Sequence, residues 1–197
     1  MPVSLTKGGN ISLTKEVAKT PGAAPLTAVT VGLGWDARTT DGAKFDLDAV
    51  ALGLGADGKV LGQDGFIFFN QLVGAGGAIQ HTGDNRSGEG EGDDEQIKVD
   101  LANLPAGLEK VVFAVVIFDG ETNGQTFGQV RNAFVRVVNQ ADSTEIARYD
   151  LSEDSSTAAA MIFSELYKNG DDWKFRAVGD GYSGGLAALA KDYGVDV

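Results

Sequence analysis

The sequence Lys110-Val111-Val112-Phe113-Ala114-Val115-Val116-Ile117-Phe118 is typical of a buried β-strand. It consists mainly of β-branched and aromatic residues, which strands favour, and turn residues lie on both sides of it. Similar stretches recur along the chain, with glycine or other turn residues between them. Further strands are predicted at Thr27 to Trp35, Phe45 to Leu54, Phe66 to Asn70, Glu95 to Leu101, Ala133 to Asn139, Glu145 to Tyr149, Met161 to Lys168 and Trp173 to Val178.

Helical patterns are few, so the sequence predicts an all-β fold, a β-sandwich of two mainly antiparallel sheets with a short C-terminal helix. The helix is expected at Gly185 to Tyr193, and a helical turn at Thr126 to Asn132. Asn169-Gly170-Asp171-Asp172 predicts a hairpin turn, and the repeat of Ser4-Leu5-Thr6-Lys7 as Ser12-Leu13-Thr14-Lys15 predicts two short strands around a glycine turn. No linker divides the chain, so we predict a single domain over residues 1–197.

The composition excludes several classes of function. A net charge of −12 disfavours binding to nucleic acid phosphates or anionic membranes. The chain has no cysteine, which excludes disulfides, thiolate zinc sites and cysteine nucleophiles. The N-terminus lacks the apolar core of a secretory signal, and no apolar run is long enough to span a membrane. We therefore expect a cytoplasmic protein with no membrane span and no nucleic acid partner.

The acidic loop, which we define as residues 81–95, carries the strongest functional signal. Between Asp84 and Glu95 it holds six carboxylates and one arginine. Two unit charges about 4 Å apart repel by roughly 1 kcal/mol in water and roughly 4 kcal/mol near a protein surface, so a compact loop of this kind requires a cation. Glycines at four positions let oxygen ligands converge, and oxygen-only ligands in irregular geometry favour calcium over magnesium or a transition metal. The alternative is a solvated acidic loop that holds no ion.

A second acidic group lies upstream of this loop. Asp46 and Asp48 are two residues apart on a predicted strand, so both side chains point to one face. Two carboxylates at the end of an otherwise apolar face need a partner, a cation or solvent. Asp36 directly follows the strand that ends at Trp35 and is a third member of this group. The only histidine, His81, is expected to be a loop or core residue rather than a metal ligand.

Several motifs occur in an order that is typical of one protein family. They are Gly32-Leu33-Gly34-Trp35-Asp36, Phe45-Asp46-Leu47-Asp48-Ala49, Phe69-Asn70-Gln71, the acidic loop, Phe127-Gly128-Gln129-Val130-Arg131-Asn132-Ala133 and Gly179-Asp180-Gly181-Tyr182-Ser183-Gly184-Gly185-Leu186. Over nearly its whole length the chain resembles the TerD-type proteins of bacterial tellurite resistance and stress response. The resemblance implies a β-sandwich that binds calcium through clustered acidic and amide side chains. The implied ligands are Asp36, Asp46, Asp48, Asn70, Asp84, Asn85, Asp93, Asp94 and Glu95.

The function implied by this resemblance is that of a calcium-binding, non-enzymatic stress-response protein. We expect calcium to order the acidic loop and to create a docking surface for other stress or tellurite-resistance proteins near the membrane. The alternative is a metal-dependent hydrolase that uses clustered carboxylates and a metal-activated water. No nucleophile, histidine base or cofactor motif accompanies the acids in the sequence, which favours a binding or scaffold module.

Overall fold

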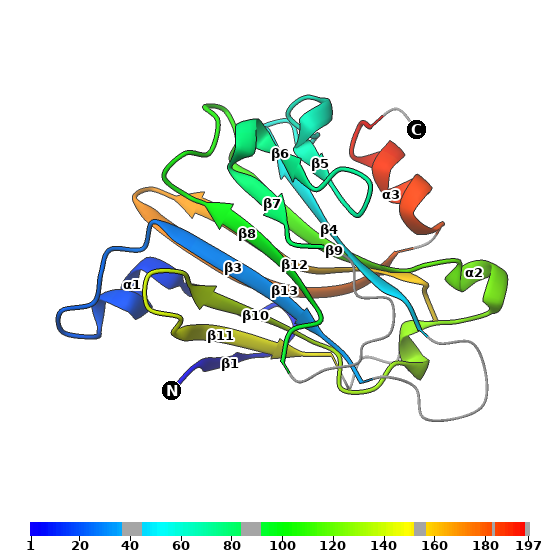
Figure 1. Cartoon of the computed structure of the whole chain (residues 1–197), viewed down its shortest axis with the longest axis horizontal. Helices are drawn as coiled ribbons and strands as arrows, with labels where there is room; N and C mark the ends of the chain where they lie inside the picture. The colour runs from blue at the N-terminus through cyan, green and yellow to red at the C-terminus, as the bar shows by residue number, and fades with distance from the viewer. Residues whose placement is uncertain (37–44, 84–91, 152–156, 183, 196–197) are drawn as a thin grey trace.

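The chain forms two β-sheets that pack face to face, as Figure 1 shows. The computed structural model describes residues 1–36, 45–83, 92–151, 157–182 and 184–195. Within these residues the first sheet has seven strands and the second has six. Neighbouring described strands run antiparallel, except that β1 and β11 run parallel. The predicted all-β sandwich is confirmed.

The order of the strands across each sheet differs from their order along the chain. Across the first sheet lie β1 (Val3–Leu5), β11 (Glu145–Asp150), β10 (Phe134–Asn139), β3 (Ala28–Gly34), β8 (Glu95–Asp100), β7 (Ile79–His81) and β6 (Val73–Gly74). Across the second lie β2 (Asn10–Ser12), β13 (Asp172–Tyr182), β12 (Ala160–Asn169), β9 (Lys110–Ile117), β4 (Leu47–Leu54) and β5 (Phe66–Ile67). The helices are α1 (Leu13–Ala18), α2 (Gly120–Asn123) and α3 (Gly185–Asp192), and single 3₁₀ turns occur at Gln63–Gly65, Ala75–Gly77 and Phe127–Gln129.

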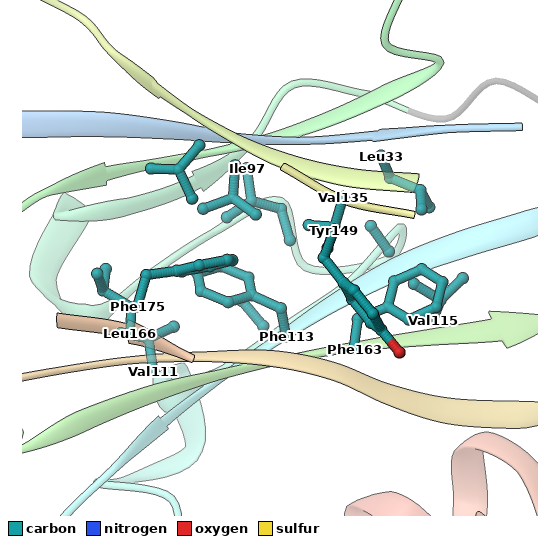
Figure 2. Close-up of a cluster of buried hydrophobic side chains, with 14 of the residues drawn as sticks. Leu33, Ile97, Val111, Phe113, Val115, Val135, Tyr149, Phe163, Leu166 and Phe175 are labelled. Carbon is teal, nitrogen blue, oxygen red and sulfur yellow. The ribbon is translucent and has the colours of Figure 1, made fainter. Parts of the chain in front are cut away.

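The core fills the space between the two sheets. Figure 2 shows Phe113, Phe163 and Phe175 of the second sheet there, together with Ile97 and Val135 of the first. These five side chains are at most 3% exposed. Burial of this kind stabilises a fold by roughly 1.5–3 kcal/mol for each large apolar side chain.

Helix α3 covers the outer face of the second sheet and explains why β9 is apolar on both faces. Its residues Leu186, Leu189 and Ala190 pack with alternate residues of β4 and β9, such as Leu52 and Val112. The intervening residues of β4 and β9 face the core between the sheets instead. The predicted C-terminal helix is therefore confirmed.

The N-terminal segment differs from the prediction. Strands β1 and β2 both form, but β1 joins the first sheet beside β11 and β2 joins the second beside β13, so they do not form a hairpin. The second copy of the repeat continues as a helix, because the Ser12 side chain caps α1 by accepting a hydrogen bond from the Lys15 N–H at 3.1 Å. The strands of the N-terminal segment therefore lie in different sheets, β1 in the first and β2 in the second.

The nine strands predicted after the N-terminal segment are all present, although β5 ends three residues earlier than expected, at Ile67. The helical turn near Phe127 and the hairpin turn between β12 and β13 are also confirmed, with Asn169 opposite Asp172. Strands β6 and β7 were not predicted. They have only two and three residues, and the intervening turn contains Gly76 and Gly77. Such short strands show no recognisable alternation of apolar and polar residues. None of the described helices has the length and apolar character required to cross a membrane.

Replacing Leu189 by alanine tests the packing of α3 on the second sheet. Leu189 is 0% exposed, so Leu189→Ala should lower the free energy of unfolding by about 2–5 kcal/mol. Lys191→Ala on the exposed side of the same helix should change it by less than about 0.5 kcal/mol. Urea unfolding followed by circular dichroism measures both values, and equal small losses would mean that α3 does not pack on the sheet.

Candidate metal site

Most of the predicted ligands gather at one end of the sandwich. There β3 ends beside the beginnings of β8 and β10, and β4 begins beside the end of β9. The backbone N–H of Ala49 in β4 donates to Oε2 of Glu95 in β8 at 2.6 Å, so these strand ends of the two sheets meet. The candidates at this end are Asp36, Asp46, Asp48, Asp93, Asp94 and Glu95.

The Trp35 backbone connects Asp36 with Asp94. The Trp35 N–H donates to Oδ2 of Asp94 at 2.9 Å, and Asp36 is the next residue along the chain. The backbone N–H of Asp94 donates to the Leu33 carbonyl at 2.8 Å, which fixes the approach of the acidic loop to β3. Oδ2 of Asp36 accepts a hydrogen bond from Nδ2 of Asn132 at 2.5 Å. Two carboxylates from distant parts of the sequence are thus brought to one place.

The position of the Asp94 carboxyl is electrostatically unfavourable. Burial raises its pKa above the ordinary value, while the hydrogen bond from Trp35 lowers it. The negative charges of Asp93, Glu95 and Asp36 raise the pKa of Asp94 further. The carboxylate form of Asp94 is therefore disfavoured by its neighbours, and a nearby cation would reverse that effect.

The carboxylate of Asp93 forms an ion pair with Arg136 on the outer face of the first sheet. Its Oδ1 accepts from Nε of Arg136 at 2.7 Å, and its Oδ2 accepts from Nη2 of Arg136 at 3.1 Å and from Nε2 of Gln96 at 3.0 Å. The Asp93 side chain is 1% exposed. Gly32 makes room for it, because a Cβ at Gly32 would lie 2.2 Å from Oδ2 of Asp93. These contacts favour a structural role for Asp93 over ligation.

Glu95 points between the sheets. Besides the Ala49 N–H, its Oε2 faces Nε2 of His81 at 3.4 Å, and both side chains are fully buried. Nδ1 of His81 accepts from the Gly83 N–H at 3.1 Å, so the proton of a neutral ring is on Nε2, toward Glu95. His81 is thus a core residue, as expected, and Glu95 joins three strands.

The remaining candidates, Asp46, Asp48 and Asn70, differ in burial and in their positions relative to the second sheet. Asp48 is 4% exposed and lies on the outer face of the second sheet, whereas Asp46 is only partly buried. The Asp46 carbonyl accepts from the Phe118 N–H at 2.8 Å. Asn70 is exposed in the turn that follows β5. Asp84 and Asn85 lie outside the described residues, among which no three Asp, Glu or His side chains are close enough together to hold a metal ion. The ligand set stays a prediction.

The chain as a whole matches one family of proteins. The family model described as the TerD domain matches residues 1–193. The chain belongs to the TerD family. Its relatives include proteins named for tellurium resistance and for stress response, and the family match confirms the resemblance found in the sequence.

Two curated relatives and one solved structure illustrate this TerD membership. "Tellurium resistance protein TerD" of Serratia marcescens is 54% identical over 197 residues, which cover 100% of this chain and 99% of that protein. "General stress protein 16U" of Bacillus subtilis (strain 168) is 50% identical over 198 residues, which cover 100% of both. A crystal structure of a homologue of telluride resistance protein (TerD) from Streptomyces coelicolor A3(2) has a TM-score of 0.70 at 24% identity, and the match covers 87% of this chain and 99% of that chain. This structural match supports the fold.

Sequence reasoning missed the partners that hold the acids of this TerD protein in place. Arg136 lies 43 residues from Asp93, and Ala49 lies 46 residues from Glu95. A local signal existed only for Arg136, a single basic residue among the apolar residues of a predicted strand. Such a residue on the outer face of a sheet commonly pairs with a nearby acid, and here Arg136 reaches Asp93 across the intervening strand β3.

The raised pKa of Asp94 predicts how stability depends on pH without calcium. Because its pKa is higher in the folded protein than in the unfolded chain, the stability contributed by Asp94 is present at low pH and is lost as pH rises through the folded-state pKa. Asp94→Asn removes the charge and keeps an acceptor for the Trp35 N–H. In chelator at pH 7 this variant should be at least as stable as the parent, and the difference should shrink toward pH 4.

Urea unfolding of both proteins between pH 4 and pH 7 measures this effect. Asp171→Asn makes the same change of charge in the exposed turn between β12 and β13 and should alter stability by less than about 0.5 kcal/mol at any pH in this range. A large loss of stability in Asp94→Asn at pH 7 would contradict the electrostatic account of this position.

Proposed function

We propose that this TerD-family chain is a calcium-binding, non-enzymatic stress-response protein that acts as a calcium-dependent binding or scaffold module. The observation that supports calcium binding best is the position of Asp94. Burial raises the pKa of its partly buried carboxyl, and repulsion by the charges of Asp93, Glu95 and Asp36 raises that pKa further. A cation near Asp94 would offset this repulsion and stabilise the carboxylate.

The donor set fits calcium in its chemistry. Asp36, Asp46 and Asp94 would supply carboxylate oxygens, and Asp84 and Asn85 would add further oxygens from the acidic loop. Calcium takes six to eight oxygen ligands in flexible geometry, including backbone carbonyls and waters, so the set need not consist of side chains alone. We assign Asp93 and Glu95 to supporting roles, because their oxygens accept hydrogen bonds from Arg136 and Ala49. Bound calcium would supply positive charge that orders the acidic loop.

The contacts of His81 leave a metal-dependent hydrolase with carboxylates alone as general bases. A hydrolase of that kind needs a general base that can reach a substrate or a metal-bound water. His81 is 4% exposed, and its two ring nitrogens face Gly83 and Glu95. The histidine is therefore part of the connection between the sheets. We propose that the ordered loop acts in the cytoplasm as a docking surface for other stress or tellurite-resistance proteins near the membrane.

Calcium titration tests the proposed site directly. At a calcium concentration about 100 times the dissociation constant, binding should add roughly 2.7 kcal/mol to the free energy of unfolding, which corresponds to a rise in Tm of roughly 5–10 °C. Asp94→Asn should lose most of this rise, because it removes a coordinating charge. Isothermal titration calorimetry and thermal melting in calcium and in chelator give the two measurements.

Asp171→Asn is the matched control, because it removes the same charge from an exposed turn. At about 0.15 M salt the screening length is roughly 8 Å, so a distant surface charge should have little effect on calcium affinity. Equal losses in both variants would show that net charge, and not a formed site, attracts calcium. No heat and no change in Tm for the parent protein would refute calcium binding altogether.

The non-enzymatic assignment predicts that the protein does not reduce tellurite. Its sequence contains no cysteine and no motif for a redox cofactor. Purified protein mixed with tellurite and a nicotinamide reductant should give the same rate of tellurite loss as a protein-free mixture. Turnover above that background would make the protein an enzyme.

A further inference from the structure

A small pocket lies where the end of β9, helix α2 and the start of α3 meet. We call it the α2–α3 pocket; its volume is about 260 Å³, and Asp48, Phe69, Phe118, Asp119, Glu121 and Leu186 contribute to its lining. In Figure 1 the start of α3 lies close to α2, at the end of the sandwich where β9 finishes. Of these residues only Asp48 is among the predicted calcium ligands.

The walls of the pocket are held in place by contacts between its elements. Oε1 of Glu121 in α2 accepts a hydrogen bond from the Gly184 N–H at the start of α3, at 3.1 Å. The Phe69 and Phe118 rings meet edge to face with centroids 6.0 Å apart. The Phe118 side chain is nevertheless 46% exposed, so much of its ring remains available to a ligand.

The charge of the pocket selects a cation. Among the residues that the structure describes, the side chains that line it include three carboxylates, those of Asp48, Asp119 and Glu121, and no lysine, arginine or histidine. The N-terminus of α3 contributes a partial positive charge of only about one half, and Glu121 already accepts a hydrogen bond there. An anion would therefore be repelled, although the helix N-terminus alone would attract one.

The shape and the aromatic wall select an organic cation over a metal ion. Among the described residues, these carboxylates do not converge closely enough to coordinate a metal. An exposed aromatic ring attracts ammonium and guanidinium groups through its face, and arginine is the more frequent partner because its planar head is weakly hydrated. Pockets for drug-sized ligands span about 300–1,000 Å³, so a volume of about 260 Å³ suits a single side chain.

We infer that the α2–α3 pocket receives an arginine side chain of a partner protein, with the guanidinium group over Phe118 and among the carboxylates of Asp48, Asp119 and Glu121. Asp48, at 4% exposed, lies deep in the pocket, whereas Asp119 and Glu121 are exposed at its mouth and present their charges to a ligand. The partner is thus recognised by a basic residue that projects from its surface. This inference does not depend on calcium binding.

Titration with N-acetyl-arginine amide, followed by NMR of the labelled protein in chelator, tests the pocket. The amide signals of Gly120, Gly184 and Leu186 should shift in a saturable way, with a dissociation constant of about 1 mM, as expected for one side chain. N-acetyl-citrulline amide has nearly the same shape without the charge and should give no saturable shift. Equal binding of the two probes would overturn the inference.

Variants separate the aromatic and the charged contributions. Phe118→Leu keeps an apolar wall but removes the aromatic face, and should weaken arginine binding about two- to five-fold. Glu121→Gln keeps an acceptor for the Gly184 N–H and should weaken binding by up to about five-fold. Asp171→Asn, which removes a charge far from the pocket, should leave the affinity unchanged.

Two outcomes would contradict the inference without affecting the calcium proposal. Unchanged affinity in Phe118→Leu, with the melting temperature of the parent, would show that the ring does not contact the probe. Displacement of the arginine probe from these amides by millimolar calcium would show that the carboxylates form a metal site instead.

Discussion

The buried carboxylate of Glu95 makes the contact on which one end of the sandwich, the end with the candidate metal site, depends. Glu95 begins β8 in the first sheet, yet its Oε2 accepts the N–H of Ala49 in β4 of the second sheet at 2.6 Å. Strand β5 pairs with β4 only at Ala51 and Leu52. Ala49 lies outside that pairing, and its N–H donates to the Glu95 carboxylate instead. His81 of β7 faces the same oxygen. Breaking such a buried connection leaves polar groups without partners, which commonly costs about 1–3 kcal/mol or more.

This connection also explains how three consecutive acids can coexist. The chain bends at Gly92, where φ is 101°, and the three acids that follow take different directions. Asp93 turns to the outer face and pairs with Arg136, Glu95 enters the space between the sheets, and Asp94 stays at the strand ends beside Asp36. Asp93 and Glu95 thereby have polar partners within the sheets. Asp94 accepts the Trp35 N–H, and its pKa is raised first by burial and then by the neighbouring charges.

The sequence predicted the sandwich well because strand propensity is a local property. The β9 stretch and the other predicted strands carry enough β-branched and aromatic residues to be recognised alone. Strand β7 could not be recognised, since Ile79–His81 is too short to show a period. The placement of β1 and β2 in different sheets depends on their contacts with β11 and β13, more than 130 residues away.

The candidate site was predictable in composition but not in arrangement. Clustered acids and glycines mark the acidic loop as a place of unusual charge. Which acids have protein partners depends on the register of β8 between β3 and β7, and no local pattern contains that register. The same limit applies to Asp48, whose strand could be recognised in the sequence although the α2–α3 pocket beside it could not.

The proposed calcium ligands and the α2–α3 pocket share the boundary between β4 and β9. The carbonyl of Asp46 accepts a hydrogen bond from the N–H of Phe118. A candidate calcium ligand and the aromatic residue of the pocket are therefore connected through their backbones. Ordering of Asp46 by an ion would therefore restrict Phe118, and a guanidinium bound over Phe118 would restrict Asp46 in turn. Coupling between two binding events must be equal in both directions. A docking surface built on this boundary would respond to calcium through one hydrogen bond between neighbouring strands, without any rearrangement of the sandwich.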